Sequence, residues 1–310
     1  MRYVFLINPK AGKGKGPETL APAIHKYFEG KDADYKIILT SAPDDARIKA
    51  AEEVQKGDEV TVFACGGDGT VFETLNGVYG YKNARLGVIP CGSGNDFLKV
   101  FESAAPFSDV AAQLEGEAVD IDIIKADDIC CMNICSLGMD AVVADGMTAF
   151  KNIPLVSGSM AYKLSIVKTF LGKLGVKVKV TIDGKCLGVI DSLFAICANG
   201  TTYGGGYNAS PKASPFDAKL EWLLVKKISK LKILSFLKLY EEGKHENLPC
   251  CMSGSCTWME IETEEPSPIN LDGEIIHKNK VRFEVAKRGV KFVLPRGITA
   301  KYAAADATTV

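Results

Sequence analysis

The sequence predicts an α/β domain followed by an all-β domain. Up to about Ala118, buried strand patterns alternate with amphipathic helix patterns, and beyond it strand patterns dominate. A chain of 310 residues with 47% hydrophobic content is long enough for two domains, or one large one, with a substantial core.

The first part of the chain has the rhythm of a parallel sheet covered by helices. Strands are expected at residues 3–7, 35–39, 60–64 and 86–89. Helices are expected from Pro17, over residues 44–54, and after the glycines that follow the third strand, where Val71, Leu75 and Val78 recur at helical spacing. In such folds ligands bind at the carboxyl ends of the strands.

The second part predicts a β-rich domain of sandwich type. Strands are expected at residues 119–126, 129–136, 176–182, 189–198, 220–225, 256–262 and 281–285, and helical insertions at residues 162–171 and 231–241. Residues 176–182 alternate apolar and polar side chains, as a half-exposed antiparallel strand does. The small, polar residues 301–310 are expected to be frayed.

Composition excludes several classes of function. The net charge of −1 gives no global basic field for nucleic acid. The ten cysteines form no CxxC pair and only three histidines occur, so no zinc spacing fits. Most cysteines lie in apolar runs and are expected to be buried, reduced thiols. Without a signal-peptide pattern or a spanning apolar stretch, we expect a soluble, cytoplasmic protein.

Three Gly-rich loops follow successive strands of the first part, at residues 8–16, 66–70 and 90–96. Each could be an ordinary turn, but at the carboxyl ends of parallel strands the three would converge on one crevice. A strand that ends in glycines and reopens as a helix exposes backbone N–H groups to an anion. Asp68 in the second loop would repel a phosphate unless a cation lay between them, which indicates a metal–nucleotide site.

Acidic residues supply the other parts of a phosphoryl-transfer site: Asp68, Asp96, Asp120 and Asp272. Each has a plain structural alternative. Asp96 could cap a short helix, Asp120 and Asp122 could share an exposed strand face, and Asp272-Gly273 is a typical hairpin turn. Together the loops and carboxylates indicate a magnesium-dependent nucleotide site between two domains.

Five ordered motifs carry a family resemblance. They are the Asn8-Pro9-x-x-Gly12 segment, residues 66–77 (GGDGTVFETLNG), residues 87–97 (GVIPCGSGNDF), the Asn199-Gly200-x-x-Tyr203-Gly204-Gly205-Gly206 element with Pro211 to Asp217 behind it, and Asp272-Gly273-Glu274. The chain resembles, over about residues 2–295, the lipid kinases that share the diacylglycerol kinase catalytic domain. Sphingosine and ceramide kinases are more distant relatives, and NAD kinases have a related loop.

The resemblance implies an N-terminal doubly wound α/β domain of NAD-kinase type, residues 1–122, which binds the nucleotide. A β-sandwich domain that accepts the lipid, residues 123–287, follows, and a segment near residues 288–300 returns to the first domain. The implied reaction transfers the γ-phosphate of ATP, with Mg²⁺, to a lipid hydroxyl, most simply that of diacylglycerol or a related glycerolipid.

The resemblance also implies roles for individual residues. ATP contacts would come from Asn8, Pro9, Lys10, Ala11, Gly12, Thr40, Gly66, Gly67, Asp68, Gly69, Thr70, Val71, Phe72, Glu73, Gly92, Ser93 and Asn95. Asp68 would act on the nucleotide's magnesium, with Asp96 and Asp120 completing the acidic network, and either Asp272 or Glu274 would be the general base. Ser214, Asp217 and Lys219 would hold a structural magnesium ion.

Two departures from the family pattern bear on these roles. Leu98 and Lys99 follow Phe97 where the family has an arginine, which keeps a charge but loses the bidentate fork. Ala218 replaces the glycine expected after Asp217, so the structural metal site is less well supported than the nucleotide site.

Several alternatives stay open. The chain could be an NAD kinase-like enzyme, or a catalytically silent lipid-binding regulatory protein on the same scaffold. Diacylglycerol, phosphatidylglycerol, a sphingoid base and a polyprenol all remain candidate acceptors. The expected partner is a lipid at a membrane surface, reached by peripheral contact and not by nucleic-acid binding, and homodimer formation stays open. Residues 226–238 could form a docking helix or a helix packed on the sandwich.

Overall fold

The computed structural model describes residues 1–92, 94–151, 165, 168–170, 172 and 174–298. Ser93, most of the predicted helix at residues 162–171 and the predicted frayed end lie outside them. The chain divides into two compact units. Unit 1 comprises Met1–Ile123, Ser214–Ala218 and Ala286–Val310, and unit 2 comprises Ile124–Ala213 and Lys219–Val285. The segment Ser214–Ala218, which the sequence places in the second domain, therefore clusters with unit 1.

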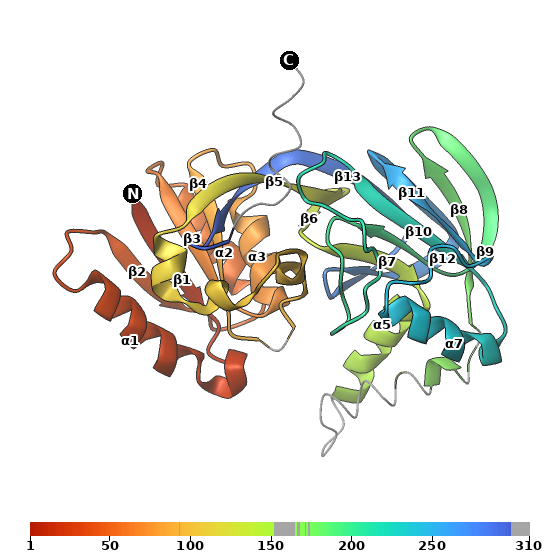
Figure 1. Cartoon of the computed structure of the whole chain (residues 1–310), viewed down its shortest axis with the longest axis horizontal. Coiled ribbons are helices and arrows are strands. Elements are labelled where there is room, and N and C mark those ends of the chain that lie inside the picture. The colour runs from red at the N-terminus through yellow and green to blue at the C-terminus, as the bar shows by residue number, and fades with distance from the viewer. Residues whose placement is uncertain (93, 152–164, 166–167, 171, 173, 299–310) are drawn as a thin grey trace. The chain divides into compact units, whose positions relative to one another are not determined.

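Unit 1 is built on a parallel sheet with the strand order β2-β1-β3-β4-β13 (Figure 1). Its strands are β1 (Arg2–Ile7), β2 (Tyr35–Leu39), β3 (Val60–Gly66), β4 (Ala84–Pro90) and the last residues of β13 (Glu274–Leu294). The β3 strand is buried along its whole length, as expected for the central strand of a sheet covered on both faces. The pairing of Phe292 with Leu86 brings the returning end of β13 alongside β4.

Helices cover both faces of this sheet, which confirms the doubly wound prediction. They are α1 (Gly16–Phe28), α2 (Asp45–Val54), α3 (Asp68–Val78) and the short α4 (Val110–Leu114), with 3-10 turns η1 (Ala11–Gly14), η2 (Asp96–Val100) and η3 (Ala105–Ser108). On one face Leu20 and Ile24 of α1 pack against Phe5 and Phe63. On the other, α2 and α3 lie so close that a Cβ on Gly77 would come within 2.4 Å of the Arg47 carbonyl.

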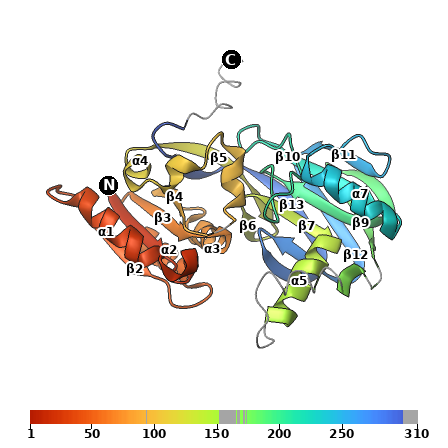
Figure 2. The same ribbon diagram turned by 60° about the horizontal axis from the view of Figure 1, so that its bottom comes forward.

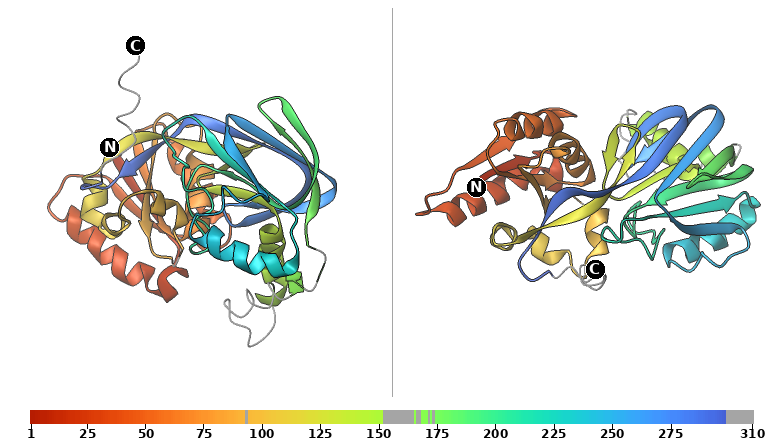
Figure 3. Two further views of the ribbon diagram at one scale, coloured as in Figure 1. Left: turned by 45° about the vertical axis from the view of Figure 1, so that its right-hand side comes forward. Right: turned by 90° about the horizontal axis from the view of Figure 1, so that it is seen from above.

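Unit 2 is built of antiparallel strands and helices. It contains β6 (Ile129–Cys131), β7 (Ile134–Gly138), α5 (Met139–Lys151), β8 (Val176–Ile182), β9 (Lys185–Ala198), β10 (Leu220–Lys226), α7 (Lys230–Glu241), β11 (Cys251–Cys256) and β12 (Trp258–Leu271). The strand β5 (Glu117–Ala126) begins in unit 1 and ends in unit 2. The order β11-β10-β9-β7-β12-β13 is antiparallel at each pairing, and β8 pairs with β9 and β12. Figures 2 and 3 show α7 along the outside of these strands.

Two predicted strands are each interrupted in the structure. The stretch at residues 129–136 is two strands, because the carboxylate of Asp272 takes the amide hydrogens of Met132 and Asn133 where a strand would pair them. The stretch at residues 256–262 spans the end of β11 and the start of β12, and the Asp183 carboxylate binds the Thr257 amide between them. Both interruptions come from residues distant in sequence.

None of the helices in the part of the chain that the structure describes is long and apolar enough to span a membrane.

Candidate functional site

The second and third Gly-rich loops are in backbone contact within unit 1. The N–H groups of Cys91 and Gly92 donate to the Gly66 carbonyl at 2.8 and 3.1 Å. A Cβ on Gly92 would lie 2.7 Å from the Gly67 Cα, closer than any real side chain comes to backbone. Glycine is therefore required at Gly92 for the two loops to meet at the carboxyl ends of β3 and β4.

Asp68, the first residue of α3, ties these loops together. The backbone N–H groups of Asn95 and Asp96 donate to its Oδ2 and Oδ1, each at 2.8 Å. Burial raises the pKa of Asp68; the Asp96 amide opposes that shift, and the Asp96 charge adds to it. A Cβ on Gly94 would come within 2.3 Å of Asp68 Oδ2, so glycine also lets the loop close over the carboxylate.

The oxygen atoms near Asp68 are of the chemical type that binds magnesium. The side-chain oxygen of Asn95 is shielded from solvent and has no hydrogen-bond partner among the described residues. Asp96 lies close enough for its charge to disfavour ionisation of Asp68, a repulsion that a divalent cation would relieve. Carboxylate and amide oxygens are the hard ligands that magnesium prefers. Outside the masked positions, however, no three His, Cys, Asp or Glu side chains converge as a ready ligand set.

Asp96 is not a helix cap. The N-cap of η2 is Asn95, in the left-handed region at φ 49°, and Asp96 is the first residue of the turn. Lys99 Nζ donates to Asp96 Oδ1 at 2.5 Å. Lys99, which replaces the family's arginine, thus binds the carboxylate one turn before it.

The first loop joins the same region through Asn8. Its Nδ2 donates to Thr70 Oγ1 at 3.3 Å, and its Oδ1 accepts the Lys10 amide at 2.9 Å. Thr40, buried at the end of β2, donates its backbone N–H to the Ile7 carbonyl at 3.0 Å. The polar residues predicted at the carboxyl ends of β1 and β2 and at the start of α3 therefore lie next to one another.

The remaining predicted nucleotide contacts divide between two elements. Pro9, Lys10, Ala11 and Gly12 lie in the connection from β1 to α1, and Gly69, Thr70, Val71, Phe72 and Glu73 lie in the first turns of α3. The Glu73 carboxylate accepts the backbone N–H groups of Asp44 and Ala46 at 2.8 and 3.1 Å. Glu73 therefore fixes the start of α2, a structural role that was not predicted from the sequence.

The buried acidic residue of β5 is Asp122 and not Asp120. Asp120 is exposed, whereas Asp122 is buried and accepts the backbone N–H groups of Ala218 and Arg288 at 2.7 and 2.8 Å. The interpretation that the two share an exposed face is wrong for Asp122. Through Ala218 this carboxylate holds the loop that contains Ser214 and Asp217, and Lys219 follows that loop at the boundary of unit 2.

In unit 2, Asp272 and Gly273 form the turn of the β12–β13 hairpin, and both have positive φ, at 52° and 103°. The hairpin interpretation is confirmed. The Asp272 carboxylate also accepts the amide hydrogens of Met132, Asn133 and Ile134 at 2.5, 3.1 and 2.9 Å. Glu274, the first residue of β13, is exposed. The two candidate bases thus differ, since three successive backbone amides bind the Asp272 carboxylate, whereas the Glu274 side chain is exposed.

A second acidic group in unit 2 lies in a hydrogen-bonded chain of tyrosines. The Tyr203 hydroxyl donates to Asp140 Oδ2 at 2.9 Å, and the Tyr240 hydroxyl donates to the Tyr203 hydroxyl at 3.2 Å. Burial raises the pKa of Asp140, against the hydrogen bonds of Ser136 and Tyr203. Tyr203 belongs to one of the sequence motifs, whereas Asp140, two residues after the glycine that ends β7, was not predicted from the sequence.

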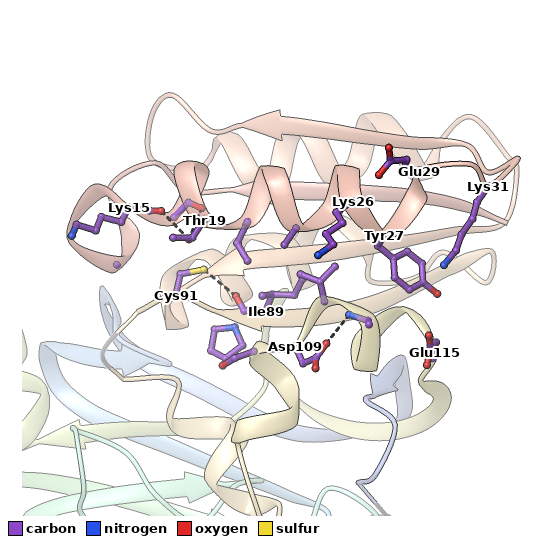
Figure 4. A pocket seen from close by; sticks show the side chains of 18 residues that line it. Lys15, Thr19, Lys26, Tyr27, Glu29, Lys31, Ile89, Cys91, Asp109 and Glu115 are labelled. Atoms are coloured by element: carbon purple, nitrogen blue, oxygen red, sulfur yellow. Dashed lines mark hydrogen bonds between the residues drawn. The ribbon is translucent and has the colours of Figure 1, made fainter.

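A groove of about 860 Å³ runs along α1 (Figure 4). Of the predicted nucleotide contacts that the structure describes, Gly12 lines it; Lys15, Thr19, Lys26 and Cys91 also face it. Two of its carboxylates are engaged, because Asp109 caps α4 through the Ala111 amide at 2.8 Å and Glu115 pairs with Arg296 at 2.5 Å. The groove borders the first Gly-rich loop. Its lining does not include Asp68, Asn95 or Asp96, which together are called the Asp68 cluster.

The comparisons with known proteins match both parts of the chain. Residues 2–126 match the model of the diacylglycerol kinase catalytic domain. Residues 133–294 match the model of the YegS C-terminal NAD kinase beta sandwich-like domain, which alone covers more than half of the chain.

Curated relatives and solved structures agree with these matches. "Probable lipid kinase YegS-like" of Shewanella frigidimarina is 30% identical over 74% of this chain and 75% of its own length. "Diacylglycerol kinase" of Bacillus subtilis is 26% identical over 95% of this chain and 97% of its own. A diacylglycerol kinase structure from Bacillus anthracis superposes with a TM-score of 0.68 at 21% identity, covering 96% of this chain and 98% of that one. An NAD kinase from Archaeoglobus fulgidus in complex with ATP shares the fold at a TM-score of 0.51 and 13% identity, covering 96% of this chain and 94% of that one.

Proposed function

This chain belongs to the lipid kinase family that joins a diacylglycerol kinase catalytic domain to a YegS-type β-sandwich-like domain, and we propose that it transfers the γ-phosphate of Mg-ATP to a lipid hydroxyl. The observation that carries the proposal is the Asp68 cluster. One partly buried carboxylate joins the two glycine loops beside a shielded amide oxygen of Asn95 that lacks a partner among the described residues.

The donor nucleotide is proposed to lie on the three Gly-rich loops. Backbone N–H groups at the carboxyl ends of parallel strands and at the start of α3 favour phosphate oxygens without needing side-chain charge. Asn8 and Thr70, joined at 3.3 Å, orient the side chains at this edge. The backbone N–H of Lys10 donates to the Asn8 side chain. The positively charged ammonium group of Lys10 would attract the phosphates.

Magnesium, when bound, would neutralise phosphate charge and orient the γ-phosphate for transfer. The side-chain oxygens of Asp68 and Asn95 would hold the ion, with Asp96 beside them. The backbone N–H of Asn95 donates to the Asp68 carboxylate and keeps the two residues together. A structural magnesium ion at Ser214, Asp217 and Lys219 remains a separate proposal, in which Asp122 positions the loop through Ala218.

The general base is proposed to be Glu274. A base must accept a proton from the attacking hydroxyl, so its lone pairs must be accessible. Three backbone amides occupy the Asp272 carboxylate, whereas Glu274 is exposed two residues further along. We therefore assign Asp272 to positioning: it fixes the hairpin from which Glu274 extends.

Diacylglycerol or a related glycerolipid is the proposed acceptor. The support is the naming of full-length relatives as diacylglycerol kinases at 24 and 26% identity. The alternatives to test are an NAD kinase-like enzyme, suggested by the shared fold, and a catalytically silent lipid-binding protein.

The test is radiolabelled phosphate transfer from ATP to separate acceptors: diacylglycerol, phosphatidylglycerol, a sphingoid base, a polyprenol and NAD. Label in a lipid with none in NAD supports the proposal, and label in NAD alone replaces it with NAD kinase activity. Binding of lipid with no transfer to any acceptor would identify a silent protein. The Asp68→Asn variant, which keeps the shape of the side chain, should lose transfer; unchanged transfer would remove Asp68 from the magnesium role.

A further inference from the structure

Asn133 lies buried in unit 2, in the short break between β6 and β7. Its backbone N–H donates to both carboxylate oxygens of Asp272, at 3.1 and 3.2 Å. The backbone N–H of Asp272 donates in return to the Ile134 carbonyl at 3.3 Å. The hairpin turn that carries Asp272 and Glu274 is therefore attached to this short segment in both directions.

The other polar groups of Asn133 bind the loop that begins at Asn199. The Asn133 carbonyl accepts the backbone N–H groups of Asn199 and Gly200 at 2.8 and 3.1 Å. The side-chain Nδ2 donates to the Thr202 carbonyl at 2.9 Å. This loop is the first part of the sequence motif at residues 199–206. One residue thus joins two of the sequence motifs, the loop and the Asp272 turn.

The contact between the Asn133 side chain and the loop requires glycine at position 200. A Cβ on Gly200 would lie 2.0 Å from Asn133 Oδ1 and 3.1 Å from its Cγ. Asn133 Oδ1 is itself shielded from solvent and has no hydrogen-bond partner among the described residues. A buried amide oxygen without a partner disfavours folding, and such costs are typical of functional sites.

The loop is also fixed at its next residue, Tyr203. The Tyr203 hydroxyl donates to Asp140 of α5 at 2.9 Å and accepts the hydroxyl of Tyr240 of α7 at 3.2 Å. The backbone N–H of Tyr203 donates to the Tyr207 carbonyl at 3.1 Å. Asn133 therefore ties the Asp272 turn to a loop that is itself held on two helices of unit 2.

We propose that Asn133 is a positioning residue for phosphoryl transfer: its side chain, through Thr202, fixes the turn from which the general base extends. The inference rests on the proposed function and gives the motif at residues 199–206 a role in it. A general base must lie within hydrogen-bond distance of the proton that it accepts. A displacement of about 1 Å can lower the rate about 10²-fold. Loss of the contact with Thr202 should therefore lower kcat and leave the proposed ATP contacts in unit 1 unchanged.

The test compares Asn133→Ala with Asn83→Ala in steady-state phosphate transfer from ATP to diacylglycerol, at a temperature where all proteins are folded. Asn133→Ala keeps the backbone bonds to Asp272 and loses the side-chain bond to Thr202. Asn83, just before β4, donates its Nδ2 to two backbone carbonyls at 2.9 Å, so its variant loses bonds of the same kind elsewhere. Asn133→Ala should lose about 10–100-fold in kcat with an unchanged KM for ATP, and Asn83→Ala should keep both values. A wild-type kcat in Asn133→Ala, or an equal loss in Asn83→Ala, would overturn the proposal.

Gly200→Ala tests the same contact from the side of the loop. Its Cβ should displace the Asn133 side-chain amide and lower kcat to about the level of Asn133→Ala. In Asn133→Ala/Gly200→Ala the nearest remaining atom is the Cα of residue 133, at 3.6 Å, so the second substitution should add no further loss. Losses that simply add in the double variant would show that the two residues act independently, against the proposal.

Hydrogen exchange separates this inference from the proposed function, because it needs no acceptor. The N–H groups of Asp272 and Gly273 donate to the Ile134 carbonyl and to Asn270 Oδ1, so their exchange reports on the turn. In Asn133→Ala, exchange over residues 270–275 should be about tenfold faster than in the wild type, with exchange in unit 1 unchanged. Unchanged exchange in the turn would contradict the role of Asn133. A wild type that phosphorylates no acceptor would instead contradict the proposed function, and the positioning role with it.

Discussion

The carboxylate of Asp68 accepts the backbone N–H of Asp96 at 2.8 Å, which joins the start of α3 to the start of η2. Two acidic residues are thereby held side by side in a buried setting that raises the pKa of Asp68. Proteins rarely bury adjacent carboxylates without a use for them, because desolvation and mutual repulsion both disfavour their ionised forms. A bound cation would offset both costs, which is why this cluster is the core of the functional proposal.

The contact between the glycine loops predicts different outcomes for two glycine substitutions. Gly92→Ala places a Cβ 2.7 Å from the Gly67 Cα and should separate the loops, lowering both stability and ATP binding. Gly67→Ala places its Cβ 3.6 Å from the Gly92 Cα, an ordinary contact, and should fold normally. We expect the Gly67 variant to show a raised KM for ATP with an unchanged melting temperature. Equal melting temperatures for both variants would contradict the proposed loop contact.

The two aspartates of β5 predict a second matched pair. Asp122→Asn replaces an acceptor of two backbone amides by a group that can accept only through one oxygen, and should cost about 1–3 kcal/mol in the free energy of unfolding. Asp120→Asn should change stability by less than about 0.5 kcal/mol because the side chain is exposed. Urea unfolding checks both. If Asp120→Asn nevertheless abolishes transfer at unchanged stability, Asp120 has the catalytic role that the family resemblance implies.

A buried carboxylate at the opposite end of the sheet predicts acid sensitivity. Glu53 is 2% exposed and contacts Arg2, Lys36 and Lys56. Burial raises its pKa, but the bonds from Lys56, Lys36 and Arg2 outweigh it and lower the pKa from 4.5 to about 2. A depressed folded-state pKa contributes stability that is present above pH 4.5 and lost as the pH falls toward 2.

Glu53→Gln should therefore cost about 2–3 kcal/mol at pH 7, less than the full shift because Lys36 and Lys56 are half exposed. The difference from the wild type should shrink as the pH falls from 5 toward 2. Glu59→Gln is the control, since its ion pair with Arg85 is 3.4 Å long and exposed. A Glu53 variant with a difference that does not depend on pH would show that packing, not charge, is responsible.

Asp140 predicts the opposite pH dependence. Burial raises its pKa, so the folded state favours the protonated form and wild-type stability is lost as the pH rises through the folded-state pKa. Asp140→Asn, which can still accept from Tyr203, should be more stable than the wild type at pH 8 and no more stable near pH 3. Thermal unfolding across this range measures the difference. A variant destabilised at pH 8 would show that the ionised Asp140 is favoured by its surroundings.

Local patterns predicted much of the fold because they depend on neighbouring residues. The strand at residues 35–39 and the alternating strand at residues 176–182 were predicted at their observed bounds. Where predictions were wrong, a residue far along the chain decided the outcome. Asp272 interrupts a strand through amides about 140 positions away, and Asp122 is buried because its partners lie 96 and 166 positions away. No periodicity in the sequence shows such a contact.

The candidate site divides in the same way. The glycine loops and Asp68 could be recognised in the sequence, because a run of glycines after a strand and a carboxylate within that run are local patterns. The proposed division of roles between Asp272 and Glu274 was not visible in the sequence, because it depends on which carboxylate the backbone amides of Met132, Asn133 and Ile134 occupy. The structural role of Glu73 at the start of α2 was hidden for the same reason.

The most direct test of the central claim is single-turnover phosphate transfer from radiolabelled ATP to diacylglycerol by Glu274→Gln and Asp272→Asn, each compared with the wild type at a temperature where all three proteins are folded. If Glu274 is the general base, Glu274→Gln should keep its stability and lose about 10²–10⁴-fold in the rate of transfer. Asp272→Asn should mainly lose stability, because one of the two oxygens that accept the three amides becomes a donor. Transfer by Glu274→Gln at the wild-type rate would contradict the account.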